Sequence, residues 1–434
     1  MKRFISFCLL IIMVFLLVSC GSAGDMGAPS LNNVTTDNKN ESTSKDNPSD
    51  TDTQNQTTGN NITQDPPVDN KKVIKFVAAG DALIHSAIYR EAETIASDKT
   101  NYSGNYYFND MYQGIASIIK SADIAFVNHE APIANTVISG YPNFNAPSES
   151  GDALVDIGFN VVNIANNHMY DVDHKATGYS DTIDYWNSKD VLMIGGYKSQ
   201  EDYDTPRIMN VEGVNIAFLS YTDFVNPPCT MNSKSVNKGY ISPIAKDSVM
   251  IKQIETAKKK ADLVFVSIHW GAENVFTPNA EQKRVAKLLA DNGVDVIIGH
   301  HSHTVQPVEW IKGTSGNNTL CIYSLGNLIS GMLSSKNMVG GLMTFDIVKE
   351  NGEISIENPI YEPIVCHYEI DDFSKKDPEG NPVRTNFKVY LMKDYTEALT
   401  KKHGTQKYGS YGLNTLQNYV KNTVSSSFLP DYLK

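Results

Sequence analysis

The sequence predicts an α/β layered fold between about residue 71 and residue 330, and two observations support this fold class. Short β-branched apolar runs alternate with amphipathic stretches of helical period, which is typical of strands and helices packed in layers. Hydrophobic residues make up 41% of the 434 residues, enough for a sizeable buried core. The net charge of -12 argues against a nucleic-acid-binding protein, which would need a basic surface.

The first 70 residues differ from this pattern and predict export. Residues 1–19 hold two basic residues followed by an apolar run, as in a secretory signal peptide. The run ends at Ser19-Cys20, which resembles a bacterial lipobox, so we expect a lipid on Cys20 to anchor the protein to the extracytoplasmic face of the cell membrane. An uncleaved signal anchor is the alternative. Residues 20–70 are rich in Asn, Thr, Ser and Asp and are expected to form a flexible tether.

The elements of the folded part follow from the hydrophobic pattern. Six apolar runs are expected to be strands, at residues 73–77, 124–127, 161–164, 214–219, 263–266 and 294–298. Four amphipathic stretches are expected to be helices, at residues 109–121, 174–189, 246–260 and 280–292. Closely spaced strands after residue 315 indicate a second sheet or an antiparallel extension. We therefore assign the α/β domain to residues 71–332, and sheet-completing strands with a C-terminal helical extension to residues 333–434.

Polar side chains follow five of the six predicted strands. They are Asp81 after the first, Glu130 after the second, Asn167 and His168 after the third, His269 after the fifth, and His300, His301 and His303 after the sixth. The carboxyl ends of the strands form the ligand-binding edge of open α/β sheets, so we expect these side chains to converge. Carboxylate, amide and imidazole ligands on one rim predict a divalent-metal site.

Each of these residues also has a structural interpretation that the sequence leaves open. Asp81 could cap a helix, Asn167 could form an Asx turn, and Glu130 could be a solvated loop charge. His269 could be a core histidine. The three histidines within residues 300–303 have few structural uses, and this clustering favours the metal interpretation.

Taken in order along the chain, the motifs also carry a family resemblance. They are Gly80-Asp81, Asn128-His129-Glu130, Asn166-Asn167-His168 with Asp171, His269-Trp270-Gly271, Gly299-His300-His301-Ser302-His303 and Ser324-Leu325-Gly326-Asn327. This set resembles the bacterial CapA family of poly-γ-glutamate capsule biosynthesis proteins, over about residues 73–330. That family is in turn similar to the calcineurin-like metallophosphoesterases, which implies a four-layer α/β/β/α sandwich.

The resemblance implies one or two divalent ions, of Mn, Fe, Zn or Mg, and a role for each motif. The implied ligands are Asp81 and His303 for one metal, Asn167, His269 and His301 for the other, and Glu130 as the bridge. His168 is implied as a proton donor or anion stabiliser facing the substrate, with Asp171 orienting it. The additional candidates are His85, His300 and Asn327.

Two departures from the phosphoesterase pattern bear on the chemistry. The usual Asp-x-His opening is here Asp81-Ala82-Leu83, so an imidazole of the first metal site is missing unless His85 replaces it. The bridging position carries Glu130 in place of Asp. The implied function is a surface lipoprotein of capsule or polyglutamate biosynthesis that hydrolyses or transfers an ester or amide of an anionic polymer or phosphoester. The alternative is a non-catalytic component that binds the polymer beside membrane synthase or export proteins.

Overall fold

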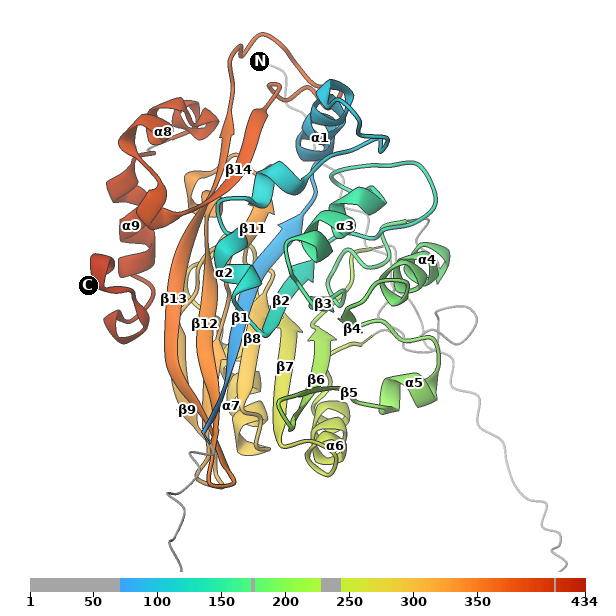
Figure 1. Ribbon diagram of the computed structural model, residues 1–434, viewed down its shortest axis with the longest axis vertical. Helices are drawn as coiled ribbons and strands as arrows, with labels where there is room; N and C mark the ends of the chain where they lie inside the picture. Colours follow the sequence, from blue (N-terminus) through green and yellow to red (C-terminus); the bar gives the residue numbers. More distant parts are fainter. Residues whose placement is uncertain (1–70, 173–175, 228–242, 410) are drawn as a thin grey trace, which may run out of the picture. The chain divides into compact units, whose positions relative to one another are not determined.

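The computed structural model describes residues 71–172, 176–227, 243–409 and 411–434. The predicted signal peptide, Cys20 and the tether lie outside the described residues, and lipid anchoring therefore stays a prediction. Among the described residues, no helix has the length and apolar character needed to cross a membrane. The folded unit contains two β-sheets flanked by helices (Figure 1).

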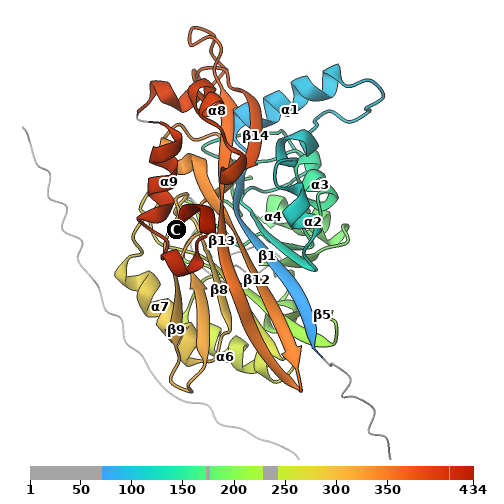
Figure 2. The same cartoon turned by 60° about the vertical axis from the view of Figure 1, so that its left-hand side comes forward.

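The first sheet has eight strands, in the order β14-β13-β12-β1-β2-β3-β4, with β11 also paired to β1. Its strands are β1 (Lys72–Leu83), β2 (Ile124–His129), β3 (Val161–Asn163), β4 (Leu192–Ile194), β11 (Asn327–Ser330), β12 (Val339–Glu350), β13 (Glu353–Glu369) and β14 (Thr385–Leu391). Strands β1 to β4 are parallel, and β12 to β14 continue the sheet in antiparallel order beside β1, as Figure 2 shows. The antiparallel extension expected from the sequence is therefore present.

The second sheet has six strands, in the order β5-β6-β7-β8-β10-β9. They are β5 (Arg207–Val211), β6 (Val214–Thr222), β7 (Leu263–His269), β8 (Val296–His300), β9 (Val308–Lys312) and β10 (Asn318–Ile322). The four central strands are parallel, and β5 and β9 are antiparallel edge strands. Parallel central strands place all their carboxyl ends at one edge, which is where the site is built.

The core between the two sheets is apolar and rich in aromatic rings. Phe76 of the first sheet stacks on Phe345 at 4.5 Å between ring centroids and meets Phe265 of the second sheet edge-on at 5.4 Å. Helices cover the outer faces. The first sheet is covered by α1 (Ser86–Asp98), α2 (Ala116–Lys120), α3 (Ser148–Asp156) and α4 (Ala176–Asn187), and the second by α6 (Asp247–Lys258) and α7 (Ala280–Asp291). The α/β/β/α layering is thus confirmed.

The remaining helical elements are short. They are α5 (Gln200–Asp204), α8 (Glu397–Lys402) and α9 (Leu413–Lys421), with 3-10 turns η1 (Asn109–Tyr112), η3 (Ser335–Met338), η4 (Met392–Asp394), η5 (Gly404–Lys407), η6 (Ser426–Phe428) and η7 (Asp431–Leu433). Helix α9 places Leu416 and Val420 in the core cluster that also holds the residues between the sheets.

The structure corrects one predicted helix. The stretch 109–121 is divided into η1 and α2, because Gly114 between them forms a bridge with Tyr390 of β14. A Cβ at Gly114 would lie 2.2 Å from the carbonyl oxygen of Val389, so this close approach depends on glycine. The strands β4, β5, β9 and β14 and the helices α1, α3 and α5 were not predicted.

Candidate metal centre

Side chains from the carboxyl ends of strands in both sheets meet at one edge of the fold, which we call the rim. Asp81 lies near the end of β1, Glu130 directly follows β2, and His269 ends β7, while His301 and His303 follow β8. All five side chains are at most 3% exposed. Their ligand atoms form two overlapping groups, each within 4.8 Å, namely Asp81, Glu130 and His303, and Glu130, His269 and His301. Glu130 belongs to both groups.

The unpaired polar atoms at the rim test whether a metal ion fits. Both carboxylate oxygens of Glu130 and the Nδ1 atoms of His269 and His301 are buried without a hydrogen-bond partner. Buried polar groups in folded proteins are rarely left in this state, and a buried carboxylate needs a cation or hydrogen bonds. Carboxylate and imidazole donors together suit a divalent transition ion. The residues present therefore fit such a metal.

Charge interactions within the rim are strong because water is excluded. His303 Nδ1 lies 3.3 Å from Asp81 Oδ2, and its Nε2 lies 3.6 Å from Glu130 Oε1. Burial lowers the pKa of His303, but the carboxylates of Glu130 and Asp81 outweigh this and raise it to about 10. Burial raises the pKa of Glu130 well above its usual value, with His303 opposing the shift. The rim thus holds carboxylates that require positive charge next to them.

The loop after β8 adopts an uncommon backbone conformation. His301 has φ +88° and His303 has φ +53°, both in the left-handed region that non-glycine residues rarely enter. Backbone of this kind concentrates at functional sites, where the surrounding structure holds it in place. The two rings lie 5.9 Å apart, centroid to centroid, and Ser302 between them donates its hydroxyl to the carbonyl of Thr304 at 2.7 Å.

A chain of amide hydrogen bonds orients Asp81. Asn128 Nδ2 donates to Asp81 Oδ1 at 2.8 Å, and Asn163 Nδ2 donates to Asn128 Oδ1 at 2.8 Å. The hydroxyl of Ser220 in turn donates to Asn163 Oδ1. Asn163 and Ser220 were missed from the sequence. Asn163 ends β3 and Ser220 lies near the end of β6, and a polar residue at the carboxyl end of a strand is the signal that could have found them.

A second polar group lies beside the rim, around His168. Asp171 Oδ2 lies 2.6 Å from His168 Nδ1 and accepts a hydrogen bond from Phe144 N at 2.8 Å. Asn226 Nδ2 also lies 3.0 Å from His168 Nδ1, and it was missed from the sequence. His168 lines a cavity of about 280 Å³ whose wall includes His303. This arrangement brings His168 and the rim to one cavity.

Asn167 and Asn327 contact rim histidines directly. Asn167 Oδ1 lies 2.9 Å from His269 Nε2, and Asn327 Oδ1 lies 3.0 Å from His303 Nδ1. An acceptor beside one ring nitrogen fixes the tautomer and orientation of a metal-binding histidine. In this structure Asn167 therefore positions His269, in addition to the ligand role that the family resemblance implies for it.

His85 and His300 are placed differently from the main ligands. His85 lines the same cavity, but its Nδ1 accepts a hydrogen bond from Gly331 N at 3.1 Å, and it belongs to neither of the two ligand groups. His300 is fully buried, with Nδ1 3.2 Å from Asp81 Oδ1 and its ring stacked on Phe126. His300 thus contacts Asp81, but neither His300 nor His85 is a member of the ligand groups that share Glu130.

Glu273 is a further acidic residue at the rim that sequence reasoning missed. Its carboxylate forms a third group with His301 and His303, and its side chain is exposed where it lines the cavity. The signal in the sequence is its position four residues after His269. His129, in contrast, lies near the carbonyl of Ala131 and against the ring of Trp186, away from the ligand groups.

Comparison with known sequences places these residues in a family context. Residues 75–332 match the sequence model of the family described as bacterial capsule synthesis protein PGA_cap. The chain is 30% identical over 259 residues to the capsule biosynthesis protein CapA of Bacillus anthracis, covering 57% of this chain and 60% of that protein. It is 30% identical over 251 residues to the PGA biosynthesis protein CapA of Bacillus subtilis (strain 168), covering 56% and 62%. The matches thus span about three-fifths of the length of these curated relatives.

Comparison with solved structures gives more distant similarities. One is a hypothetical protein from Thermus thermophilus, with 15% identity, a TM-score of 0.38, and coverage of 66% of this chain and 98% of that one. Another is the calcineurin-like phosphoesterase YfkN from Bacillus subtilis, with 12% identity, a TM-score of 0.37, and coverage of 81% and 96%.

Proposed function

Because this chain belongs to the bacterial capsule synthesis protein family PGA_cap, we propose that it acts in polyglutamate capsule synthesis as a metal-dependent hydrolase or transferase. The bond it acts on is an ester or amide of an anionic polymer or phosphoester. The observation that carries this proposal is the pair of buried ligand groups that share Glu130. The two CapA relatives are named for capsule biosynthesis and PGA biosynthesis, which supports the choice of polymer.

The ligand groups assign the metal-holding residues. One divalent ion fits Asp81, Glu130 and His303, and a second fits Glu130, His269 and His301. When bound, such ions supply a water molecule of lowered pKa and polarise the oxygen under attack. The identity of the ion, among Mn, Fe, Zn and Mg, is a matter for elemental analysis.

The chain's own residues provide the proton transfer. Asp171 occupies Nδ1 of His168 and thereby leaves Nε2 as the nitrogen that exchanges a proton with substrate. Phe144 N fixes the Asp171 carboxylate, so His168 is held in one orientation at the wall of the cavity. In this assignment His168 protonates the leaving group, and Asp171 is the positioning residue.

A second candidate function is a non-catalytic one, in which the rim binds and guides the polymer. Leu83 stands where the phosphoesterase pattern has an imidazole, and His85 directs Nδ1 to the backbone of Gly331. The group around Asp81 therefore contains only one of the rim histidines, His303. A weaker first site would favour binding over catalysis.

For its location, we propose that a lipid on Cys20 holds the protein at the extracytoplasmic face of the cell membrane, beside polyglutamate synthase or export proteins. The supporting observation is the apolar N-terminal run that ends at a small residue before Cys20. Metabolic labelling with a fatty-acid probe tests this: the wild type should incorporate label, and Cys20→Ser should not.

The catalytic proposal is tested with purified protein of known metal content. Hydrolysis of γ-glutamyl peptides, polyglutamate and generic phosphodiesters is measured with added Mn²⁺ and with EDTA, for wild type, His168→Ala and Asp81→Ala. Arg284→Gln serves as the control, because Arg284 lies on α7 and pairs with Asp247 outside the rim. We expect metal-dependent hydrolysis that His168→Ala and Asp81→Ala both lose. A protein that binds metal, hydrolyses none of these compounds and supports capsule formation in both variants would exclude the catalytic function.

A further inference from the structure

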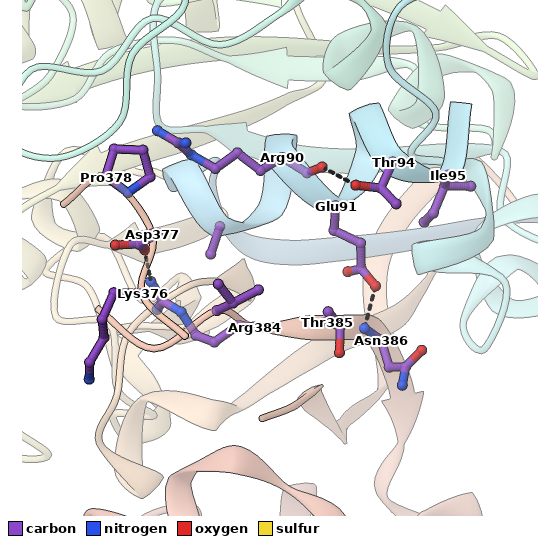
Figure 3. A pocket seen from close by; sticks show the side chains of 12 residues that line it. Arg90, Glu91, Thr94, Ile95, Lys376, Asp377, Pro378, Arg384, Thr385 and Asn386 are labelled. Atoms are coloured by element: carbon purple, nitrogen blue, oxygen red, sulfur yellow. Dashed lines mark hydrogen bonds and ion pairs between the residues drawn. The ribbon is translucent and has the colours of Figure 1, made fainter. Parts of the chain in front are cut away.

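A second cavity, with a volume of about 410 Å³, lies between α1 and the residues that lead into β14. Figure 3 shows α1 along one wall, with Arg90 and Glu91, and residues 376–386 along the opposite wall, with Arg384. Sites for small molecules typically have volumes of roughly 300–1,000 Å³, so this cavity is large enough for a ligand. The function proposed above uses none of these side chains.

Unpaired polar atoms gather at this cavity as they do at the metal rim. In the described part of the chain, thirteen buried side-chain atoms lack a hydrogen-bond partner. Six of them belong to the rim residues Glu130, His269 and His301 and to the neighbouring His300. Four others belong to residues that line this cavity, namely Arg90 Nε, Arg384 Nε, Asp377 Oδ2 and Thr385 Oγ1. Arg384 is only 5% exposed. Since buried polar groups are nearly always hydrogen-bonded, this gathering indicates a place for a polar ligand.

The two guanidinium groups favour a carboxylate. Arg90 Nη2 lies 2.9 Å from Glu379 Oε1, and Arg384 Nη2 lies 3.7 Å from Asp377 Oδ2, so each arginine has one acidic partner and an unused Nε donor. In Figure 3 both guanidinium groups extend from opposite walls toward the end of the cavity formed by Asp377 and Pro378. The planar arginine side chain matches the geometry of a carboxylate better than any other cation.

The other walls favour an organic ligand over a bare inorganic anion. Glu91 accepts hydrogen bonds from the backbone N–H of Asn386 and of Phe387, which fixes its carboxylate between α1 and β14. This acidic group suits an amide N–H, which inorganic phosphate lacks. Ala87 and Val383 supply apolar surface for a short aliphatic stem.

The cavity lies next to the rim cavity, with Gly331 between them. The carbonyl of Gly331 accepts from Arg384 Nη1, while its N–H donates to His85 Nδ1, and His85 lines the rim cavity. A Cβ on Gly331 would lie 2.7 Å from His85 and 3.3 Å from Arg384. A ligand held by Arg384 would therefore be close to the rim without contacting the metal ligands.

We propose that this cavity binds a carboxylate-bearing amide chain, with the carboxylate between Arg90 and Arg384 and an amide N–H at Glu91. The choice of a glutamyl chain as the ligand rests on the function proposed above. The cavity and its hydrogen-bond donors are features of the structure and do not depend on that function. In that setting the cavity holds an acidic segment of the polymer beside the rim.

The test is calorimetric titration of the purified protein with a γ-linked glutamyl trimer. Arg90→Gln is expected to weaken binding by about 10-fold, the usual effect of removing a hydrogen bond to a charged group. Arg284→Gln is the matched control, because Arg284 is also a helical arginine paired with acidic residues but lies outside the cavity, and it should leave binding unchanged. Thr385→Val removes the unpaired hydroxyl and should weaken binding by about 3-fold. If circular dichroism shows that Arg90→Gln does not fold, the Thr385→Val variant alone tests the site.

Three further measurements separate this proposal from the others. Inorganic phosphate and a neutral γ-linked glutaminyl trimer should bind more weakly than the acidic trimer, and phosphate binding of equal strength would overturn the ligand class. Equal binding by the wild type, Arg90→Gln and Thr385→Val would overturn the site. Glu130→Gln, which disables the rim, should bind the trimer normally. Loss of binding in that variant would place the trimer on the rim and refute the cavity. If the rim of the wild type binds no metal, the proposed function fails, but the trimer should still bind in the cavity.

Discussion

Replacing Glu130 by Gln is expected to abolish most metal binding without destabilising the metal-free protein. The Glu130 carboxylate is fully buried, both oxygens lack hydrogen-bond partners, and the nearest basic atoms are His269 Nε2 at 3.4 Å and His303 Nε2 at 3.6 Å. Asp81 adds a second negative charge to the same rim. Without a metal ion, Gln replaces, at constant shape, a carboxyl group whose ionisation is disfavoured by burial. With a metal ion, the variant lacks the ligand that both groups share.

The size of the effect follows from linkage. Free metal at 1,000 times its dissociation constant stabilises the folded state by about 4 kcal/mol. The folded unit spans residues 67–434, and an unfolding entropy of about 2.1 cal/mol/K per residue amounts to about 0.8 kcal/mol/K for the whole unit. The wild type should therefore unfold about 5 °C higher with saturating metal than in EDTA. In Glu130→Gln this difference should fall to about 1 °C or less.

The assay is differential scanning calorimetry of both proteins with EDTA and with Mn²⁺, together with elemental analysis of metal content. Glu91→Gln is the control, because Glu91 is also a shielded glutamate but lies outside the rim, and it should keep the full metal-induced shift. The reasoning would be refuted if Glu130→Gln kept the metal-induced shift, or if it unfolded well below the wild type in EDTA.

Three other changes have defined outcomes. Asp171→Asn should lower hydrolysis by about 10-fold to 100-fold at unchanged metal content, because His168 loses its orienting carboxylate; equal loss of metal would contradict a positioning role. Asn163→Ala, measured by urea unfolding, should cost about 1–3 kcal/mol because Asn128 loses its buried partner, and an unchanged midpoint would refute the amide chain. Burial, with Glu369 adding to it, raises the pKa of Glu91 to about 7, so folding binds this proton and wild-type stability should fall as pH rises from about 4.5 to 7. Glu91→Gln should remove up to about 3 kcal/mol of that fall, and parallel stability curves for the two proteins would rule this out.

The sequence supplied the strands that position the rim, because each is a dense apolar run, buried on both faces of its sheet. Each predicted strand has a counterpart in the structure. The rule that ligands gather at strand ends predicts Asp81 and His269 at one rim, where each belongs to a ligand group with Glu130. Asn163 escaped notice because one amide in a three-residue strand does not alter a hydrophobic pattern. Helix α1 escaped because it has no capping signal: His85 stands at its N-cap and makes no side-chain hydrogen bond there.

The hydrophobic pattern of the sequence could not predict the backbone conformation of the loop that follows β8. Its left-handed residues, His301 and His303, are fixed by long-range contacts, such as the 3.0 Å contact of His303 with Asn327 on the first sheet. Residues that are close only after the two sheets have packed cannot be paired from local sequence. The same applies to Glu273, which meets His301 and His303 from the loop after β7.

The rim is assembled from both sheets, and this links metal binding to the packing of the sandwich. Asp81 and Glu130 come from the first sheet, whereas His269, His301 and His303 come from the second. A metal ion held by either ligand group would therefore join the two sheets across their carboxyl edge. The inner core of Phe76, Phe265 and their neighbours holds the sheets together independently of that ion. Because the core already stabilises the fold, the rim can keep the strained backbone of His301 and His303 and the unpaired carboxylate oxygens of Glu130. These features lower the stability of the metal-free protein, but they provide the ligands that a metal ion needs.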